Sequence, residues 1–126
     1  MILPPALVNL LNGNEIQSAK GPVFATAIIA GTMAVKKTSD LIPFCHPLAI
    51  ENCKINIQFN QEKLSLQIDC VVTITGKTGV EMEALVGCNI AALTVYDMCK
   101  AITHDMIISE CKLISKTGGK SDISPK

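Results

Sequence analysis

The stretch Cys53-Lys-Ile-Asn-Ile-Gln-Phe-Asn-Gln-Glu-Lys-Leu-Ser-Leu-Gln-Ile-Asp-Cys-Val-Val-Thr-Ile74 alternates apolar and polar residues on both sides of a short polar link. Such alternation places every second side chain on the same face of a β-strand. The link at residues 60–63 then joins two antiparallel strands, residues 53–59 and 64–74, into a hairpin. One face of this hairpin is apolar and must be covered by other elements.

Helices are predicted on both sides of the hairpin in the sequence. Residues 4–12 form a short helix that Gly13 ends, and residues 21–37 form a second helix that is apolar nearly all the way round. A third helix of about 25 residues follows residues 76–79 and runs to His104. Residues 106–115 are expected to be a last strand. The order predicts an α+β fold, an antiparallel sheet with helices packed on one face.

Length and composition favour one domain over residues 1–126. Apolar residues make up 48% of the chain with no Trp, so part of this aliphatic surface is expected to be buried in an oligomer. The longest uncharged stretch, residues 21–35, is shorter than the roughly 18 residues that a membrane span needs. The N-terminus has no signal-peptide pattern. We therefore expect no membrane partner and a cytoplasmic location.

The charges and cysteines narrow the classes of site. The net charge of zero argues against a nucleic-acid partner. All eleven basic residues are Lys, so any bound phosphate must be held by ammonium groups and backbone N–H groups. The six cysteines form no CxxC pair, and most are interpreted as small core residues in a reducing compartment.

Two glycine-containing stretches imitate a phosphate-binding P-loop but lack its first glycine. The motif around Gly76-Lys77-Thr78 has Val71 at that position, and the motif around Gly119-Lys120-Ser121 has Ile114 there. The first stretch precedes a predicted helix, so it remains a modest candidate for an anion site; an ordinary strand-to-helix turn explains it equally well.

One histidine lies in a rigid loop. In residues 41–49, Pro43 and Pro47 exclude a regular helix and would hold the imidazole of His46 at a fixed angle. His46 is either a structural residue or part of a site. A metal site is not expected, because the only other histidine, His104, has no matching cysteine spacing.

The long helix contains the most informative charges. Glu83, Asp97, Lys100 and His104 fall on nearly one face of an ideal helix, and Asp97 and Lys100 are close enough to form an ion pair. Such a pair is often solvated and structural. Apolar neighbours on both sides instead favour a buried pair with a lysine pKa shifted toward neutrality, as at a functional site. Both interpretations remain open from the residues alone.

The two ends of this helix cannot meet within one chain. Glu83 and Asp97 are fourteen residues apart, about 21 Å along a continuous helix. They could face each other only across an interface between two chains.

Four motifs carry a resemblance to a known family. They are Asp40-Leu-Ile-Pro-Phe-Cys-His-Pro-Leu48, Thr75-Gly-Lys-Thr-Gly-Val-Glu-Met-Glu-Ala-Leu85, Ala91-Ala-Leu-Thr-Val-Tyr-Asp-Met-Cys-Lys-Ala101 and Lys116-Thr-Gly-Gly-Lys-Ser121. In this order they resemble the cyclic pyranopterin monophosphate synthases, the molybdenum cofactor biosynthesis protein C family. The resemblance extends from about Lys20 to Ser121.

The resemblance implies a ferredoxin-like fold and a homo-hexamer, a trimer of dimers, with active sites between subunits. The implied reaction is a lyase reaction that converts (8S)-3',8-cyclo-7,8-dihydroguanosine 5'-triphosphate, a nucleotide-derived small molecule, to cyclic pyranopterin monophosphate and diphosphate. No cofactor is implied, although Mg²⁺ could accompany the triphosphate. Asp97 and Lys100 are the implied acid/base pair, and the implied substrate-binding residues are Lys20, Cys45, His46, Glu81, Met82, Glu83, Lys116 and Lys120.

The chain departs from the family pattern at its start. Members usually carry a further segment with a strand and an Arg, whereas only about nineteen residues precede Lys20 here, so the chain is expected to lack that N-terminal segment. Asp122 also follows Ser121 where Gly is common. Two alternatives therefore stay open: a catalytically silent member of the family, and a small ferredoxin-like binding or regulatory domain.

Overall fold

The predicted hairpin forms the centre of the fold in a computed structural model that describes residues 1–125. Strands β3 (Asn52–Asn60) and β4 (Ser65–Thr73) pair antiparallel, from Asn52 opposite Thr73 to Asn60 opposite Ser65. The alternation predicted from the sequence holds: Ile55 and Ile57 on β3 are buried, while Lys54, Asn56 and Gln58 are exposed.

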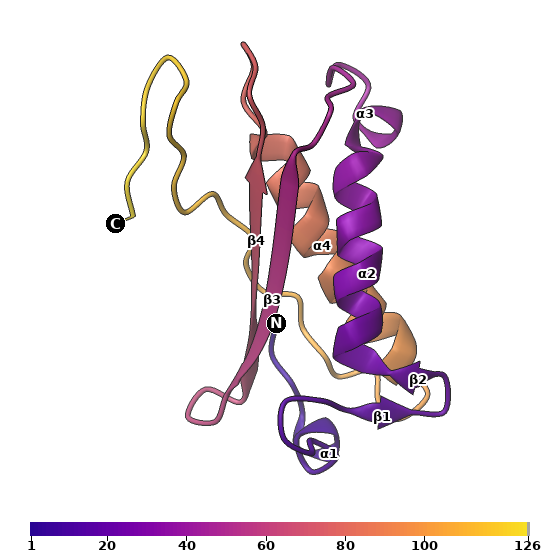
Figure 1. The fold of residues 1–126 in the computed structure, drawn as a ribbon. Coiled ribbons are helices and arrows are strands. Elements are labelled where there is room, and N and C mark those ends of the chain that lie inside the picture. Colours follow the sequence, from indigo (N-terminus) through magenta and orange to yellow (C-terminus); the bar gives the residue numbers. More distant parts are fainter. Residues whose placement is uncertain (126) are drawn as a thin grey trace.

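Two helices cover the apolar face of the hairpin. Helix α2 (Val23–Lys36) packs on β3 and helix α4 (Glu81–Cys99) packs on β4, so both lie on the same side of the sheet (Figure 1). They cross at two glycines, Gly31 and Gly87, each of which has no room for a side chain. The prediction of an α+β fold with helices on one face is confirmed.

A second small sheet lies before α2. Strand β1 (Gln17–Ser18) pairs antiparallel with β2 (Gly21–Pro22), and α2 begins directly after it. Pro22 offers no side-chain cap to α2. The carboxylate of Glu15 takes this role, because it accepts hydrogen bonds from the backbone N–H groups of Phe24 (2.7 Å) and Ala25 (3.1 Å).

Several predicted boundaries were wrong. The first helix, α1, covers only Pro5–Val8 instead of residues 4–12, and a further short helix, α3 (Thr38–Leu41), precedes the proline-containing loop. Helix α4 ends at Cys99 rather than at His104. The β-branched Ile102 and Thr103 disfavour a longer helix, and the Thr103 hydroxyl binds the N–H of Asp105 instead. His104 therefore does not share a helical face with Asp97.

The last predicted strand, residues 106–115, is also mostly wrong. Only Ile107 pairs, with two backbone hydrogen bonds to Ile2, which also bridges to Ser65 of β4. The neighbouring extended segment is short, because Pro4 and Pro5 follow it and lack the N–H groups that a ladder requires. The remainder of residues 106–115 therefore has no strand to pair with and leaves the sheet.

Helix α4 is long and apolar enough to cross a membrane by length and composition alone, with a mean hydropathy of 1.2. Its buried residues include Gly87, Ala91, Val95 and Cys99, which face α2 and the hairpin. The core helix of a folded domain has the same composition, and α4 fits that description.

Candidate functional site

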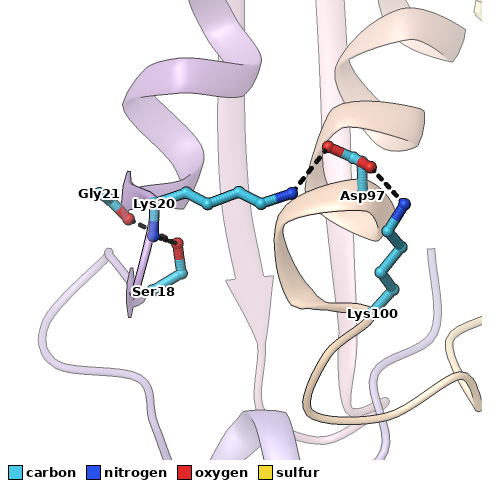
Figure 2. Close-up of polar contacts among 5 residues, drawn as sticks. All are labelled: Ser18, Lys20, Gly21, Asp97 and Lys100. Carbon is cyan, nitrogen blue, oxygen red and sulfur yellow. Dashed lines mark hydrogen bonds and ion pairs between the residues drawn. The ribbon is translucent and has the colours of Figure 1, made fainter.

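Asp97, near the C-terminal end of α4, is paired with two lysines. The Nζ atom of Lys100 lies 2.8 Å from Asp97 Oδ1, and the Nζ atom of Lys20 lies 3.5 Å from Oδ2 (Figure 2). The Lys100 contact is the helical i, i+3 pair expected from the sequence. Lys20 comes from the β1–β2 turn, which the fold places beside this end of α4. We call Lys20, Asp97 and Lys100 the lysine half-site.

The β1–β2 turn directs Lys20 toward α4. The hydroxyl of Ser18 accepts a hydrogen bond from the Lys20 N–H (3.1 Å) and donates one to the carbonyl of Gly21 (3.0 Å; Figure 2). Gly21 has a φ of 116°, which a residue with a side chain rarely adopts. Sequence reasoning missed Ser18, although a Ser three residues before a Gly is a recognisable turn signal.

The single chain has a solvated Asp97–Lys100 pair, one of the two arrangements that the sequence left open. The side chains of Asp97 and Lys100 are 56% and 51% exposed, because this face of α4 points away from the core. The Lys100 ammonium lowers the pKa of the Asp97 carboxyl, and Lys20 adds to the effect. Asp97 in turn raises the pKa of Lys100. Lys100 is therefore a protonated acid in the isolated chain, not a lysine shifted toward neutrality.

A second cluster lies at the N-terminal end of α4. Oε1 of Glu81 is 2.9 Å from Nζ of Lys116, and both side chains are mostly shielded from solvent. The contact with Lys116 lowers the pKa of the Glu81 carboxyl. The Glu81 carboxylate also folds back against Gly79, where an added Cβ would collide with it. Glycine at position 79 therefore permits this arrangement.

A pocket of about 150 Å³ opens beside this pair. The proline-containing loop contributes Cys45 and His46, and the first turn of α4 contributes Glu81, Met82 and Glu83. Glu83 is only 4% exposed, whereas Glu81 is intermediate, so the two glutamates have different surroundings. We call Cys45, His46, Glu81, Met82, Glu83 and Lys116 the glutamate half-site.

The loop before α4 is fixed by a residue that the sequence did not single out. Oε1 of Glu51, just before β3, accepts a hydrogen bond from the Thr75 N–H at 2.8 Å. This contact anchors the start of residues 75–80, which lead into the glutamate half-site. No sequence spacing points to it, because Glu51 precedes β3 and Thr75 follows β4, at the open end of the hairpin.

Lys120 lies in the C-terminal turn rather than in either half-site. Residues 116 and 123 bridge, and Asp122 Oδ1 accepts a hydrogen bond from the Gly118 N–H at 3.0 Å. Asp122, which stands where Gly is common in the family, thus stabilises the turn. Within residues 1–125, Lys120 makes no ion pair, and it is exposed.

Apart from Lys120, the predicted residues therefore form two groups at opposite ends of α4. The structure joins Lys20 to Asp97 and Lys100, and it joins Lys116 to Glu81 beside Cys45, His46, Met82 and Glu83. It does not bring the two groups together, because Glu83 and Asp97 lie on one continuous helix, about 21 Å apart along its axis.

Comparison with known proteins assigns the family. Residues 1–119 match the model of the MoaC family. The chain belongs to the MoaC family. It is 62% identical over 113 residues to the Dictyostelium discoideum protein named molybdenum cofactor biosynthesis protein 1, which covers 90% of this chain and 18% of that protein. It is 58% identical over 125 residues to the molybdenum cofactor biosynthesis bifunctional protein of a Synechocystis species, covering 97% of this chain and 36% of that protein.

A third MoaC-family relative is nearer in length. The cyclic pyranopterin monophosphate synthase of Xanthomonas axonopodis pv. citri is 55% identical over 120 residues, which are 95% of this chain and 72% of the relative. The chain thus spans well under half of the first two relatives and most of the third. The resemblance inferred from four motifs is confirmed.

Proposed function

We propose that this MoaC-family chain is a cyclic pyranopterin monophosphate synthase, a lyase of molybdenum cofactor biosynthesis. It converts (8S)-3',8-cyclo-7,8-dihydroguanosine 5'-triphosphate to cyclic pyranopterin monophosphate and diphosphate. Family membership and the names of the relatives support this proposal. The observation that carries it is the lysine half-site, where Asp97 pairs with two ammonium groups on an exposed surface.

The reaction needs proton transfers while a purine-derived ring is opened and rebuilt. Lys100 is protonated next to Asp97, so it first acts as an acid and becomes a base once it has given up its proton. Covering the pair with substrate would remove water from it, which lowers the pKa of a lysine and makes the return of the proton easier. In this proposal Asp97 holds Lys100 in position and stabilises its charged form.

Diphosphate release needs positive charge where the leaving group departs. The chain has no Arg, so lysines must supply it. We assign this role to Lys20, Lys116 and Lys120. Lys20 and Lys116 are held by carboxylates in the free protein, and substrate phosphates would take the place of Asp97 and Glu81 as their partners.

A complete site requires two chains in this proposal. The lysine half-site of one chain would face the glutamate half-site of another, because α4 separates the two groups within a chain. Exposed apolar side chains offer surfaces for assembly: Ile29 and Met33 lie on the outer face of α2, and Phe44 beside the glutamate half-site is 97% exposed. We propose a homo-hexamer, a trimer of dimers.

A ferredoxin-like arrangement is the finer fold that we propose. In chain order, the segment at residues 1–3, α2, the β3–β4 hairpin, α4 and the segment at Ile107 correspond to a β-α-β-β-α-β unit. The bridges of Ile2 to Ser65 and Ile107 support the spatial order β3, β4, residues 1–3, residue 107, all antiparallel. The segments at residues 1–3 and at Ile107 are reduced to short pairings.

We propose no cofactor for the protein itself, with Mg²⁺ entering as a partner of the substrate triphosphate. We also propose a cytoplasmic location, where the nucleotide-derived substrate would be formed. Neither a nucleic acid nor a membrane is part of this proposal.

The test is turnover of the authentic cyclic dihydroguanosine triphosphate, with released diphosphate and the pterin product both measured. The proposal expects turnover by the chain and its loss in Asp97→Asn. Binding of the substrate without turnover would support a silent or regulatory member of the family instead. Adding Mg²⁺ or a chelator in parallel determines whether the metal accompanies the substrate.

A further inference from the structure

Four of the six cysteines gather where α4 crosses the hairpin, although they are far apart in the sequence. Cys70 interacts with both Cys53 and Cys88, and Cys111 interacts with Cys88. All six cysteines are free thiols. Spacing along the chain gave no sign of this cluster, because its members come from β3, β4, α4 and the segment after α4.

Cys70 and Cys88 are neighbours where α4 packs on β4. The Cys88 thiol lies 3.4 Å from the carbonyl oxygen of Ile68, two residues before Cys70 on the same strand and face. The Cys70 sulfur lies against the backbone of the residue preceding Cys88, since a Cβ added to Gly87 would be only 2.8 Å from it. The absence of a side chain at Gly87 thus lets α4 approach β4 closely enough to place the two thiols side by side.

This pair is reachable from solvent through one cavity. Cys88 lines a pocket of about 340 Å³ between β4 and residues 108–114, the segment that leaves the sheet after Ile107. Lys63 and Lys112 also line this pocket. Cys111, which is exposed, lines the same pocket, whereas Cys70 does not. Within the pair, Cys88 is therefore the thiol that a small reagent entering the pocket meets first.

We propose that Cys88 and Cys70 form a reversible thiol–disulfide pair that is oxidised by hydroperoxides entering this pocket. Cys88 lies in the middle of α4, after Glu81 and Glu83 and before Asp97, and Cys70 lies on β4, so the pair belongs to neither half-site. It is therefore a modification site separate from the proposed lyase chemistry.

The chemistry balances in two steps. The Cys88 thiolate attacks one oxygen of the hydroperoxide, the O–O bond breaks, and a sulfenic acid forms on Cys88 while the second oxygen leaves as water or an alcohol. The Cys70 sulfur then attacks the Cys88 sulfur, the S–O bond breaks, and water leaves as the disulfide forms. The hydroperoxide takes both electrons, and the two thiol protons end in the released water or alcohol. A dithiol reductant reverses the change.

The electrostatics fit this order of events. The neighbouring Cys70 lowers the pKa of Cys88, and this outweighs the opposing effects of burial and Asp69. The same contact raises the pKa of Cys70. Cys88 is therefore the thiol of the pair that ionises first, and the thiolate is the reactive form.

Peptide mapping of the whole chain tests the proposal directly. The reduced protein is treated with a small excess of hydrogen peroxide, free thiols are alkylated, and tryptic peptides are analysed without reduction. The proposal expects peptide 64–77 to be linked to peptide 78–100, with fragmentation placing the bond at Cys88 rather than Cys99. Dithiothreitol should remove the link. A link from Cys88 to Cys111, or no link involving Cys88, would overturn the proposal.

Variants test the two roles, Cys88 as the thiol that is oxidised first and Cys70 as the thiol that attacks the resulting sulfenic acid. Cys70→Ser and Cys70→Ala should leave Cys88 as a sulfenic acid that dimedone traps, whereas Cys88→Ser should lower cysteine oxidation at the same peroxide concentration by about tenfold. Cys99→Ser, which alters the other α4 cysteine, and Cys111→Ser are matched controls that should keep the Cys70–Cys88 link. Thermal melting of each variant confirms folding. Dimedone labelling of Cys111 in place of Cys88 would contradict the assignment.

Discussion

Asp97 is the residue on which the functional account depends. Its ion pairs with Lys20 and Lys100 are more than half exposed, and pairs of this kind add little to stability. Two lysines held around one carboxylate with little effect on stability form an arrangement that suits the binding of an anionic substrate.

We expect Asp97→Asn and Lys100→Ala to lower kcat by about 10²–10⁴ each, because each removes part of one proton-transfer unit. The double variant should lose little more, since residues that act as a unit are not additive. Thermal melting should change little in all three. A fall in melting temperature with turnover kept within about threefold of the parent would show that the pair is structural.

Glu15 gives a prediction about stability rather than about activity. Partial burial by itself would raise the pKa of Glu15, but hydrogen bonds from the backbone N–H groups of Phe24, Ile16, Ala25 and Val23 outweigh it and lower the pKa. A carboxyl with a lowered folded pKa stabilises the fold fully above its ordinary value of 4.5, and this stabilisation is lost as the pH falls through the folded pKa.

Glu15→Gln should therefore reduce the free energy of unfolding at pH 7 by about 1 kcal/mol, the usual effect of losing a helix cap. The difference from the parent should shrink as the pH falls below 4.5. Denaturant unfolding of both proteins across this range measures it. A difference that is constant from pH 7 to pH 3 would rule out Glu15 as an ionised cap of α2.

At the residue scale, sequence spacing could predict only local contacts. The Asp97–Lys100 pair follows from a spacing of three on a helix. Lys20 and Lys116 reach their partners from distant parts of the chain, so only the family resemblance pointed to them. The exposure of Asp97 could not be predicted, because its apolar neighbours in the sequence lie on other sides of the helix, as buried Met98 and Cys99 show.

At the scale of elements, the hairpin and α2 were predictable because each shows a clear residue pattern. Apolar and polar residues alternate through the hairpin, and α2 is a long apolar segment. The ends of elements were not. Residues 106–115 have the composition of a strand, but a strand also needs a neighbour, and residues 1–3 offer a short one. The close crossing of α2 and α4 could not be read from the sequence either, because Gly31 and Gly87 become important only when the helices meet.

Gly31→Ala and Gly87→Ala should each destabilise the fold by about 1–3 kcal/mol, despite the higher helix propensity of Ala. An added Cβ at Gly31 would lie 2.8 Å from the Gly87 carbonyl oxygen, and one at Gly87 would lie 2.7 Å from Cγ2 of Val35. Gly119→Ala is the control, since its Cβ would meet only Lys116 Nζ at 4.0 Å. Chemical denaturation measures all three, and stabilisation in either helix variant would contradict the close crossing.

At the scale of the whole molecule, α4 acts as a spacer with a half-site at each end. The sequence already indicated that Glu83 and Asp97 cannot meet within one chain, and the continuous helix from Glu81 to Cys99 confirms it. Contact between two chains is needed to bring the two ends together. The central claim is therefore that one active site takes the lysine half-site from one chain and the glutamate half-site from another.

Reassembly of two inactive variants tests this claim most directly. Lys100→Ala removes one residue of the lysine half-site, and His46→Ala removes one residue of the glutamate half-site. Each protein alone should be nearly inactive. The two are mixed in equal amounts, dissociated and reassembled, and mixed oligomers are verified by mass. The account predicts that activity returns to roughly a quarter of the parent value. About half of the interfaces join unlike chains, and at each of these one of the two sites has both residues intact. Verified mixed oligomers whose activity stays at the average of the two variants would contradict it.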